Sequence, residues 1–279
     1  MPECFELELT DGVAHLRMSR PEAMNTMTPA FWRELPALVG ELSDAGEARA
    51  IVLSSTGKHF TAGMDLAVFQ GGSLGLAPKD EEPGRARSRT RQAALVFQES
   101  FNALEKARVP VLAAIQGGCI GGGVDMISAC DARYCTADAF FCIQEINLGL
   151  TADVGTLQRL PKLIPAGVVR ELAYTGRRMN AARAKEVGLV NEVYPTQEAM
   201  LARVLEIARE IADKSPLAIW GTKQMLNYAR DHSVEDGLEY VATWQAGMFF
   251  GTDMAEAFQA KAEKRKPVFP NNPPTRRGS

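Results

Sequence analysis

The sequence lacks the features that define several classes of protein. No apolar run approaches the length of a membrane-spanning helix, and residues 1–20 contain no apolar core of a secretory signal peptide. The five cysteines form no CxxC or Cys/His ligand pattern, and an odd number in apolar surroundings is typical of reduced, intracellular thiols. The three histidines are far apart in the sequence, so we expect neither a metal site nor a metal cofactor.

The sequence also has little excess of acidic over basic residues. The formal net charge is −3, which argues against a nucleic-acid partner. The last residues, TRRGS, do not resemble the Ser-Lys-Leu address of peroxisomal proteins. We therefore expect a cytoplasmic protein with no membrane or nucleic-acid partner. Its 279 residues, 46% of them hydrophobic and 23% charged, can bury a large core in one domain or in one domain with an appendage.

Glycine, in contrast, is concentrated in one place. Five of the seven residues 117–123 are glycine, and this stretch follows an apolar run at 111–115 and precedes a helix-like segment. Glycine permits positive φ and lets the backbone approach a ligand closely. A helix that begins in such a loop has unpaired N–H groups at the positive end of its dipole, which can hold an anion or a developing oxyanion. The absence of a Gly-Lys-Ser/Thr ending excludes a P-loop, and a plain strand-to-helix corner remains the alternative.

A second β-rich run, at residues 50–53, ends in another glycine-containing turn, FTAGMDL at residues 60–66. Two strand ends that each open into such a turn can supply one N–H group each to a single carbonyl oxygen. Three carboxylates accompany the loops: Asp125 on the first turn of the helix, and Glu145 and Asp153 on either side of an apolar, glycine-containing turn. Such a turn can desolvate a carboxyl group and raise its pKa into a range useful for proton transfer.

From the residues alone, each of these carboxylates also has a purely structural explanation. Asp125 could stabilise the dipole of its own helix, and Glu145 could be a solvated charge at a strand end. Asp153 could be the N-cap of a helix that begins at Val154. The sequence pattern by itself does not choose between these roles and catalysis.

The two loops taken together resemble those of the crotonase family, also called the enoyl-CoA hydratase/isomerases. The resemblance extends over most of the chain and rests on the order and spacing of RPEAMN (20–25), FTAGMDL (60–66), GGGVD (121–125) and ACDAR (129–133). It implies an α/β fold, with a crotonase-like spiral core of ββα units followed by a C-terminal helical region that builds trimers. We therefore predict a core over residues 1–199, a helical region over 200–279, and a homotrimer or homohexamer.

The acids narrow this resemblance to one branch of the family. Hydratases of the family carry a glutamate at the first two acidic positions, to activate and protonate a water molecule. Here the first acid is the shorter Asp125, and a third acid, Asp153, is present. With the surrounding residues 152–161, this pattern looks like the Δ3,5-Δ2,4-dienoyl-CoA isomerases. The resemblance thus implies that the double bonds of a 3,5-dienoyl-CoA are shifted to the 2,4 positions, in fatty-acid β-oxidation.

Other functions remain open at this stage. Enoyl-CoA hydration would use two of the acids to position a water molecule. Another reaction of this fold, such as thioester hydrolysis or carbon–carbon bond cleavage, would keep the oxyanion hole and use the acids differently. A non-catalytic scaffold would bind acyl-CoA without turnover. The fold alone cannot choose among these functions, because function depends on the site.

The same resemblance assigns roles to individual residues. It implies that the N–H groups of Met64 and Gly122 form an oxyanion hole for the thioester oxygen. Glu145 and Asp153 would shuttle the proton, and Asp125 would shape and polarise the site. The remaining substrate contacts would come from Ala62, Gly63, Met64, Asp65, Leu66 and Gly123. Coenzyme A would enter as part of the acyl-CoA substrate, so no separate cofactor is expected.

Local signals predict the main elements of structure. Residues 5–18 form a hairpin that turns at Asp11-Gly12, and Thr28-Pro29 caps the following helix. From Phe69 to Arg91 the apolar pattern fails, which predicts a long loop. The repeated alternation of strands and helices before residue 200 predicts an α/β core.

The end of the chain is predicted to be helical, over residues 200–214, 219–231, 234–251 and 252–264. These segments carry many large apolar side chains, which suggests an extensive contact between subunits. By resemblance to the family, the basic end at 261–266 would lie near the phosphates of a bound CoA.

Overall fold

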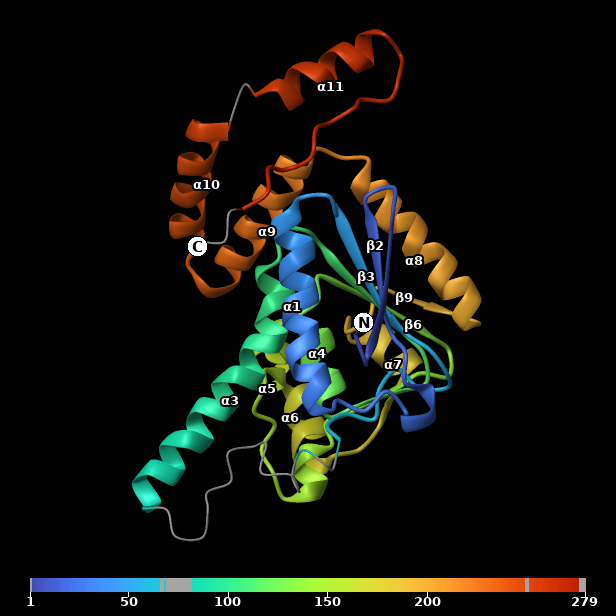
Figure 1. Ribbon diagram of the computed structural model, residues 1–279, viewed down its shortest axis with the longest axis vertical. Helices are drawn as coiled ribbons and strands as arrows, with labels where there is room; N and C mark the ends of the chain where they lie inside the picture. Colours follow the sequence, from blue (N-terminus) through green and yellow to red (C-terminus); the bar gives the residue numbers. More distant parts are fainter. Residues whose placement is uncertain (1, 66–67, 69–81, 249–250, 276–279) are drawn as a thin grey trace.

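The computed structural model describes residues 2–65, 68, 82–248 and 251–275 (Figure 1). Two β-sheets organise the described residues. The larger sheet has six strands, in the order β1 (Phe5–Thr10), β2 (Val13–Met18), β3 (Ala50–Ser55), β4 (Val111–Ile115), β6 (Ala132–Thr136) and β9 (Glu192–Tyr194). The smaller sheet has three, in the order β5 (Gly118–Ile120), β7 (Phe140–Cys142) and β8 (Met179–Asn180). Strands β2, β3, β4, β6 and β9 are parallel, so their carboxyl ends meet at one edge of the sheet.

The hairpin of β1 and β2 forms as predicted. The two strands are antiparallel, with Thr10 opposite Val13. Asp11 and Gly12 between them have φ angles of 51° and 76°. A two-residue hairpin turn needs this pair of left-handed residues, since its twist then matches that of the strands.

The first long helix, α1 (Pro29–Ala45), also begins as predicted. The Thr28 hydroxyl accepts a hydrogen bond from the Phe31 N–H group, and Pro29 is the first helical residue. The helix ends at Gly46, which has a φ of 80°. This left-handed conformation is favourable only for glycine and closes the helix.

Helices cover both faces of the larger sheet (Figure 1). On one face, α8 (Gln197–Ala212) packs through Val204 against a buried cluster that includes Val52 and Leu112. On the other face, α1 and α4 (Gly122–Ser128) enclose a larger cluster that includes Ile115. Because both faces are buried, the central strands have continuous apolar runs, at 50–53 in β3 and at 111–115 in β4. Shorter helices complete the core: α5 (Thr156–Arg159), α6 (Ala166–Thr175), α7 (Ala181–Glu186), and the 3-10 helices η1 (Pro21–Ala23), η2 (Glu145–Leu148) and η3 (Leu160–Lys162).

The predicted loop from Phe69 to Arg91 is wrong over its second half. Residues 69–81 lie outside the described residues, but α3 (Pro83–Lys106) makes residues 83–91 helical. The carboxylate of Glu82 caps this helix by accepting two N–H groups of the first turn, at 2.8 and 2.9 Å. The first turns of α3 are exposed and project from the body of the molecule (Figure 1). Because they cover no core, the apolar periodicity that would indicate a helix is missing there.

Three helices follow α8, close to their predicted bounds: α9 (Pro216–Asp231), α10 (Val234–Met248) and α11 (Thr252–Ala262). α10 packs on α9 through the rings of Trp220 and Trp244, whose centres are 5.1 Å apart. None of the described residues of α10 is buried, and α10 and α11 extend away from the sheets (Figure 1). No helix within the described ranges is long and apolar enough to span a membrane. The division at residue 200 and the assembly stay predictions.

Candidate active site

The two glycine-containing loops predicted from the sequence lie side by side. The N–H groups of Phe60 and Thr61 donate to the carbonyl oxygens of Gln116 and Gly118, at 2.8 and 3.1 Å. The Ile120 N–H group donates to the Thr61 carbonyl oxygen, at 3.1 Å. These bonds form a short parallel bridge between the loops. The carboxyl end of β3 and the start of α4 are thereby held together.

The close approach of the loops depends on glycine. Gly63 has a φ of 86°, and a Cβ atom there would lie 2.7 Å from the Ile120 carbonyl oxygen and 3.5 Å from the Gly122 nitrogen. The shorter distance is a clash with backbone, which no change of rotamer relieves. Only glycine therefore fits at position 63, and the Met64 N–H group that follows it lies near the Gly122 N–H group.

Both of these N–H groups are available to a ligand. Gly122 is the first residue of α4, so the helix offers its N–H group no acceptor. Around Met64, the Met27 N–H group donates to the Gly63 carbonyl oxygen at 2.9 Å, and the Asp65 N–H group donates to the Met27 carbonyl oxygen at 3.2 Å. This pattern directs the Met64 N–H group away from Met27. Within the part of the chain that the structure describes, neither N–H group has an acceptor.

Two polar side chains brace the loops. The amide of Asn25, in the RPEAMN motif, donates to the carbonyl oxygens of Thr56 and His59, at 2.8 and 3.1 Å. Nδ1 of His59 accepts a hydrogen bond from the Gly118 N–H group at 3.0 Å. The sequence indicated only that His59 lacks the spacing of a metal ligand. No sequence signal pointed to its bond with the glycine loop, because the partner is distant in the chain.

Asp125 is fully buried on the first turn of α4. Its Oδ1 atom accepts a hydrogen bond from the Thr156 N–H group of α5 at 2.6 Å. The carboxylate therefore bonds to a second helix, in addition to its place in the first turn of α4. Its Oδ2 atom is buried and has no partner among the described residues. Burial raises the pKa of Asp125 to about 6, although the bond from Thr156 lowers it. The carboxylate thus keeps one oxygen available to the site.

Glu145 opens the 3-10 helix η2 and is half-buried. Its Oε1 atom lies against Gly121, where a Cβ atom would be only 3.1 Å away. Its Oε2 atom is buried without a partner in the described ranges. Burial first, and then the negative charges of Asp125 and Asp153, raise the pKa of Glu145 to about 7. A fully solvated charge at a strand end does not fit these observations.

Asp153 is the most exposed of the three acids. Burial nevertheless raises its pKa. The alternative that Asp153 caps a helix at Val154 is wrong, because α5 begins at Thr156 after Gly155 and has no side-chain cap. The Asp153 carbonyl oxygen accepts a hydrogen bond from the Gln98 amide of α3 at 2.8 Å. That bond fixes the backbone of Asp153 through its carbonyl oxygen, and the carboxylate does not cap α5.

The three acids come from separate elements, yet the pKa values of Asp125 and Glu145 respond to the charges of the other acids. The charge of Asp153 contributes to the raised pKa of Asp125, and both charges contribute to that of Glu145. Carboxylates influence one another in this way only at short range in a desolvated site. The site thus combines two free N–H groups with three carboxyl groups of raised pKa.

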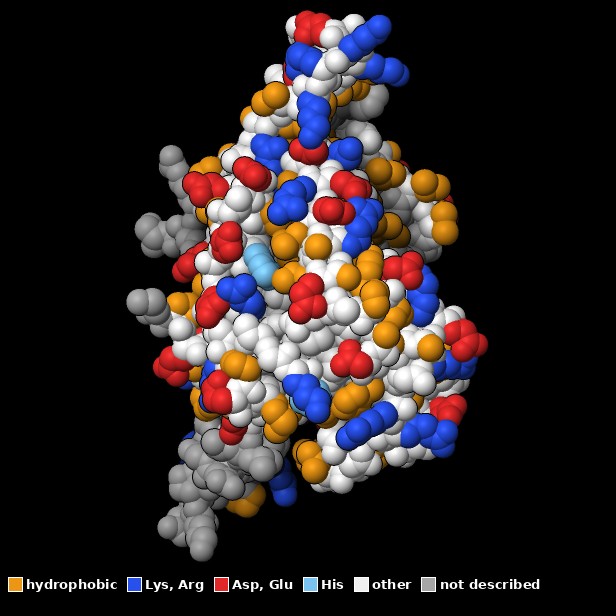
Figure 2. All heavy atoms as spheres, turned by 90° about the vertical axis from the view of Figure 1, so that its right-hand side faces the viewer, with side chains coloured by type: hydrophobic (Ala, Val, Ile, Leu, Met, Phe, Trp, Pro, Cys, Tyr) orange, Lys and Arg blue, Asp and Glu red, His pale blue; other side chains and the backbone are white. Residues whose placement is uncertain are grey.

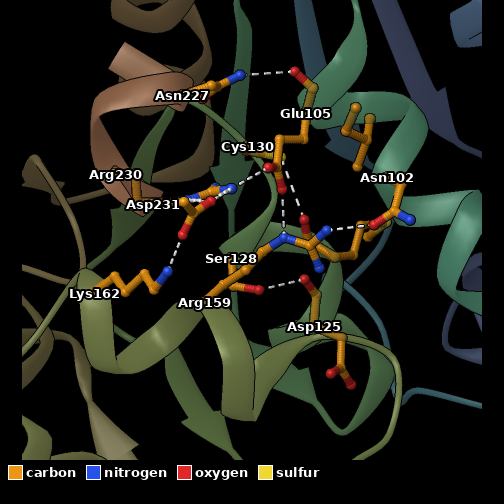
Figure 3. Close-up of polar contacts among 12 residues, drawn as sticks. Asn102, Glu105, Asp125, Ser128, Cys130, Arg159, Lys162, Asn227, Arg230 and Asp231 are labelled. Carbon is orange, nitrogen blue, oxygen red and sulfur yellow. Dashed lines mark hydrogen bonds and ion pairs between the residues drawn. The ribbon is translucent and has the colours of Figure 1, made fainter. Parts of the chain in front are cut away.

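A charged network holds the segment that carries Asp153 (Figure 3). Arg159 of α5 donates to Glu105 and Asn102 of α3, at 2.6 and 2.5 Å. Its guanidinium also packs against Gly155, where any Cβ atom would collide with it. The network continues through Arg230, Asp231 and Lys162. Its members and Asp153 line a cavity of about 300 Å³. No sequence signal indicates this network, since its ion pairs join the separate helices α3, α5, η3 and α9.

The other predicted substrate contacts lie on the same loops. The Ala62 N–H group donates to the Met24 carbonyl oxygen at 3.0 Å, and the Asp65 carboxylate accepts the Thr26 hydroxyl at 2.7 Å. Gly123 follows Gly122 in α4. Leu66 lies outside the described residues. Among the residues that are described, no group of three or more His, Cys, Asp or Glu could hold a metal ion, and the absence of a cofactor stays a prediction.

Comparisons with known proteins identify the relatives of this chain. The family described as enoyl-CoA hydratase/isomerase matches residues 8–272. The chain is 46% identical over 255 residues to the mitochondrial Δ3,5-Δ2,4-dienoyl-CoA isomerase of Homo sapiens, covering 91% of this chain and 77% of the relative. It is 43% identical over 267 residues to the peroxisomal Δ3,5-Δ2,4-dienoyl-CoA isomerase of Arabidopsis thaliana, covering 96% of each.

A solved structure supports the same fold. The crystal structure of an enoyl-CoA hydratase from Bacillus anthracis superimposes with a TM-score of 0.85 at 29% identity, covering 96% of this chain and 99% of that one. The α/β fold expected from the resemblance is therefore confirmed. The expected cytoplasmic location is wrong, because the relatives at 43% and 46% identity are peroxisomal and mitochondrial. The lack of an apolar signal peptide did not argue against a mitochondrial location, because mitochondrial transit peptides are amphipathic.

Proposed function

The chain belongs to the enoyl-CoA hydratase/isomerase family, and on that basis we propose that it is a Δ3,5-Δ2,4-dienoyl-CoA isomerase of fatty-acid β-oxidation. It converts a 3,5-dienoyl-CoA thioester to the 2,4-dienoyl isomer. The main support is its identity of 46% and 43% to two enzymes of that name, over nearly the whole chain. The third acid of the site, Asp153, agrees with this assignment, because hydration needs only two acids.

The first step that we infer is removal of a proton from C2 of the substrate. The electrons move toward the thioester oxygen and form a dienolate that extends over the conjugated double bonds. The N–H groups of Met64 and Gly122 are the proposed donors to this oxygen, and each such donor contributes about 3–4 kcal/mol to catalysis. Their lack of other acceptors within the described ranges supports the assignment.

Glu145 and Asp153 are the proposed proton-transfer pair. One takes the proton from C2 and the other gives a proton to C6, so both double bonds shift and the composition of the substrate is unchanged. The raised pKa of each acid supports this role, because a carboxyl group with a pKa near the working pH can both accept and release a proton. Asp125, tied to Thr156, would shape and polarise the site. The reaction needs no oxidant, and CoA takes part only as a portion of the substrate.

Each turnover leaves this pair with its protonation exchanged. One acid has gained a proton and the other has lost one, so a proton must return before the next turnover. The cavity of about 300 Å³ beside Asp153 supports a return through solvent. Asp153 is also the most exposed of the three acids, so it is the member of the pair that water reaches first.

We further propose that α9, α10 and α11 build a homotrimer, which can pair into a homohexamer. Leu226, Leu238 and Phe258 are 68%, 62% and 66% exposed, an unusual number of large apolar groups for a free surface. A cavity of about 630 Å³, lined mainly by apolar side chains, separates these helices. Figure 2 shows Lys and Arg side chains at the end of the molecule where α11 lies. The basic side chains of Lys261, Lys264, Arg265 and Lys266 would meet CoA phosphates there, and the helical region would correspond to residues 200–279.

Isotope labelling tests the proposed chemistry. The protein is incubated with a 3,5-dienoyl-CoA in D2O, and the product is examined by NMR. We expect a 2,4-dienoyl-CoA with deuterium at C6, because carboxyl groups exchange with solvent before they donate. A hydroxyl group at C3 would instead identify a hydratase. A 2,4-dienoyl product without deuterium at C6 would contradict proton delivery by an exchangeable acid.

A further inference from the structure

Thr61 belongs to the FTAGMDL loop (60–66) and also contacts the glycine loop (117–123). We propose that it is a positioning residue, which sets the direction and spacing of the Met64 and Gly122 N–H groups through its hydroxyl and its methyl group. This inference rests on the proposed function, since it concerns the oxyanion hole of that reaction. Thr61 itself touches no reacting atom. The resemblance to the family assigned no role to it.

The Thr61 hydroxyl makes two hydrogen bonds inside a fully buried site. It donates to the Asn25 carbonyl oxygen at 2.7 Å and accepts the Gly63 N–H group at 3.1 Å. Asn25 is itself held by bonds to the turn after β3. The hydroxyl therefore connects Gly63 to a rigid part of the structure.

The bond to Gly63 matters because of what surrounds that residue. Gly63 has no side chain and a φ of 86°, so the backbone there rotates more freely than at any other residue type. The peptide on its N-terminal side is held by Thr61. The peptide on its C-terminal side carries the Met64 N–H group and is held by the bond from the Met27 N–H group, at 2.9 Å. Loss of the Thr61 hydroxyl removes one of these two restraints.

The methyl group of Thr61 meets the other loop. A Cβ atom on Gly123 would lie 2.6 Å from the Thr61 Cγ2 atom, so the methyl group occupies the space that a side chain at position 123 would need. The backbone of Thr61 also bonds to Gly118 and Ile120 on both sides. One residue thus holds the Met64 loop by its hydroxyl and the Gly122 loop by its methyl group and backbone.

The substitution Thr61→Val separates these contributions, because it removes the hydroxyl and keeps the shape. Thr61→Ser keeps the hydroxyl and removes the methyl group. Thr136→Val is the matched control, because Thr136 is 1% exposed and its hydroxyl bonds to Asp138 at 2.5 Å and not to either loop. All three variants are compared with the unchanged protein in the same assays.

Two measurements report on positioning rather than on folding. The first is turnover of 3,5-dienoyl-CoA, with kcat and KM determined separately. The second is the affinity ratio of a saturated acyl-CoA thioester to its thioether analogue, which lacks the carbonyl oxygen. We expect Thr61→Val to lower kcat by about 10- to 100-fold, the effect of small misplacement of catalytic groups, with little change in KM. It should also reduce the preference for the thioester, while binding of the thioether is unchanged.

Thr61→Ser removes only the methyl contact with Gly123, so its losses should be smaller than those of Thr61→Val but measurable, and Thr136→Val should match the unchanged protein. Full kcat and full thioester preference in a folded Thr61→Val variant would overturn the proposal. Equal losses of affinity for the thioester and for the thioether would also overturn it, because they indicate general destabilisation. The same losses of affinity or kcat in Thr136→Val would overturn it for the same reason. If Thr61→Val does not fold, Thr61→Cys takes its place, since a thiol is a weak hydrogen-bonding group. Activity of Thr61→Cys equal to that of Thr61→Ser would then refute the role of the hydroxyl.

The binding measurement also separates this inference from the proposed function. If the unchanged protein does not isomerise 3,5-dienoyl-CoA but Thr61→Val still loses the thioester preference, the proposed reaction fails and the role of Thr61 stands. If the unchanged protein does not prefer the thioester at all, the two N–H groups do not hold the carbonyl oxygen. The role proposed for Thr61 then fails even if the isomerase activity is present.

Discussion

Replacing Glu145 by glutamine should stabilise the folded protein at alkaline pH while it removes activity. Burial and the charges of Asp125 and Asp153 raise the pKa of Glu145 from 4.5 to about 7. Between these two values the folded state holds the proton and the unfolded state releases it. The stability that the neutral acid contributes is therefore complete below pH 4.5 and is lost as the pH rises through 7. A difference of about 2.5 between the pKa values corresponds to about 3 kcal/mol.

Thermal unfolding of the unchanged protein and of Glu145→Gln, at about pH 5 and about pH 8.5, measures this linkage. The protomer concentration is kept constant, because assembly contributes to apparent stability. The free energy of unfolding of the variant, relative to that of the unchanged protein, should be about 3 kcal/mol higher at the alkaline pH than at the acidic pH. This corresponds to a relative rise of about 5–10 °C in Tm. Its turnover should fall by about 10²–10⁴-fold, the usual effect of losing one acid–base group.

Glu47→Gln is the control for this experiment, because Glu47 is exposed and is not one of the acids of the site. If the stability difference between Glu145→Gln and the unchanged protein is the same at both pH values, Glu145 is not desolvated as described. If the variant keeps full turnover, Glu145 takes no part in proton transfer.

Three further predictions follow from the site and its surroundings. Asp153→Asn should reduce turnover by about 10²–10⁴-fold with little change in affinity for CoA; full turnover would remove Asp153 from the mechanism. Gly122→Pro removes an N–H donor and distorts the loop, so turnover should vanish from the folded protein; retained turnover would mean that the donor is dispensable. Light scattering at micromolar concentration should give three or six times the chain mass of 30.3 kDa; the mass of a monomer or dimer would contradict the proposed assembly.

Features that depend on neighbouring residues were predictable from the sequence. The Asp11-Gly12 turn and the Thr28-Pro29 helix start are local arrangements, in which one or two residue types determine the backbone. The turn at Gly63 was predictable for the same reason, because glycine is the residue that readily adopts a φ of 86°. The order of these signals was enough to indicate the fold.

Features that depend on contacts between distant residues were not predictable. The exposed start of α3 carries no apolar periodicity, so it resembled a loop. The alternative interpretation of Asp153 as a helix cap failed, because the helix begins three residues later, at Thr156, whose N–H group is accepted by Asp125. The bond between His59 and Gly118 likewise joins segments that only the folded chain brings together. Local sequence propensity does not reveal such pairs, although they determine the electrostatics of the site.

The central claim is that this site isomerises a 3,5-dienoyl-CoA. Its most direct test follows the absorbance of the purified protein with a 3,5-dienoyl-CoA and, in parallel, with a 2-enoyl-CoA. We expect rapid formation of the conjugated 2,4-dienoyl-CoA from the first substrate and, by comparison, little hydration of the second. Rapid hydration of the 2-enoyl-CoA without isomerisation of the dienoyl-CoA would contradict the claim and identify a hydratase. If neither substrate reacts, the protein is neither an isomerase nor a hydratase of these substrates, and the claim is also contradicted.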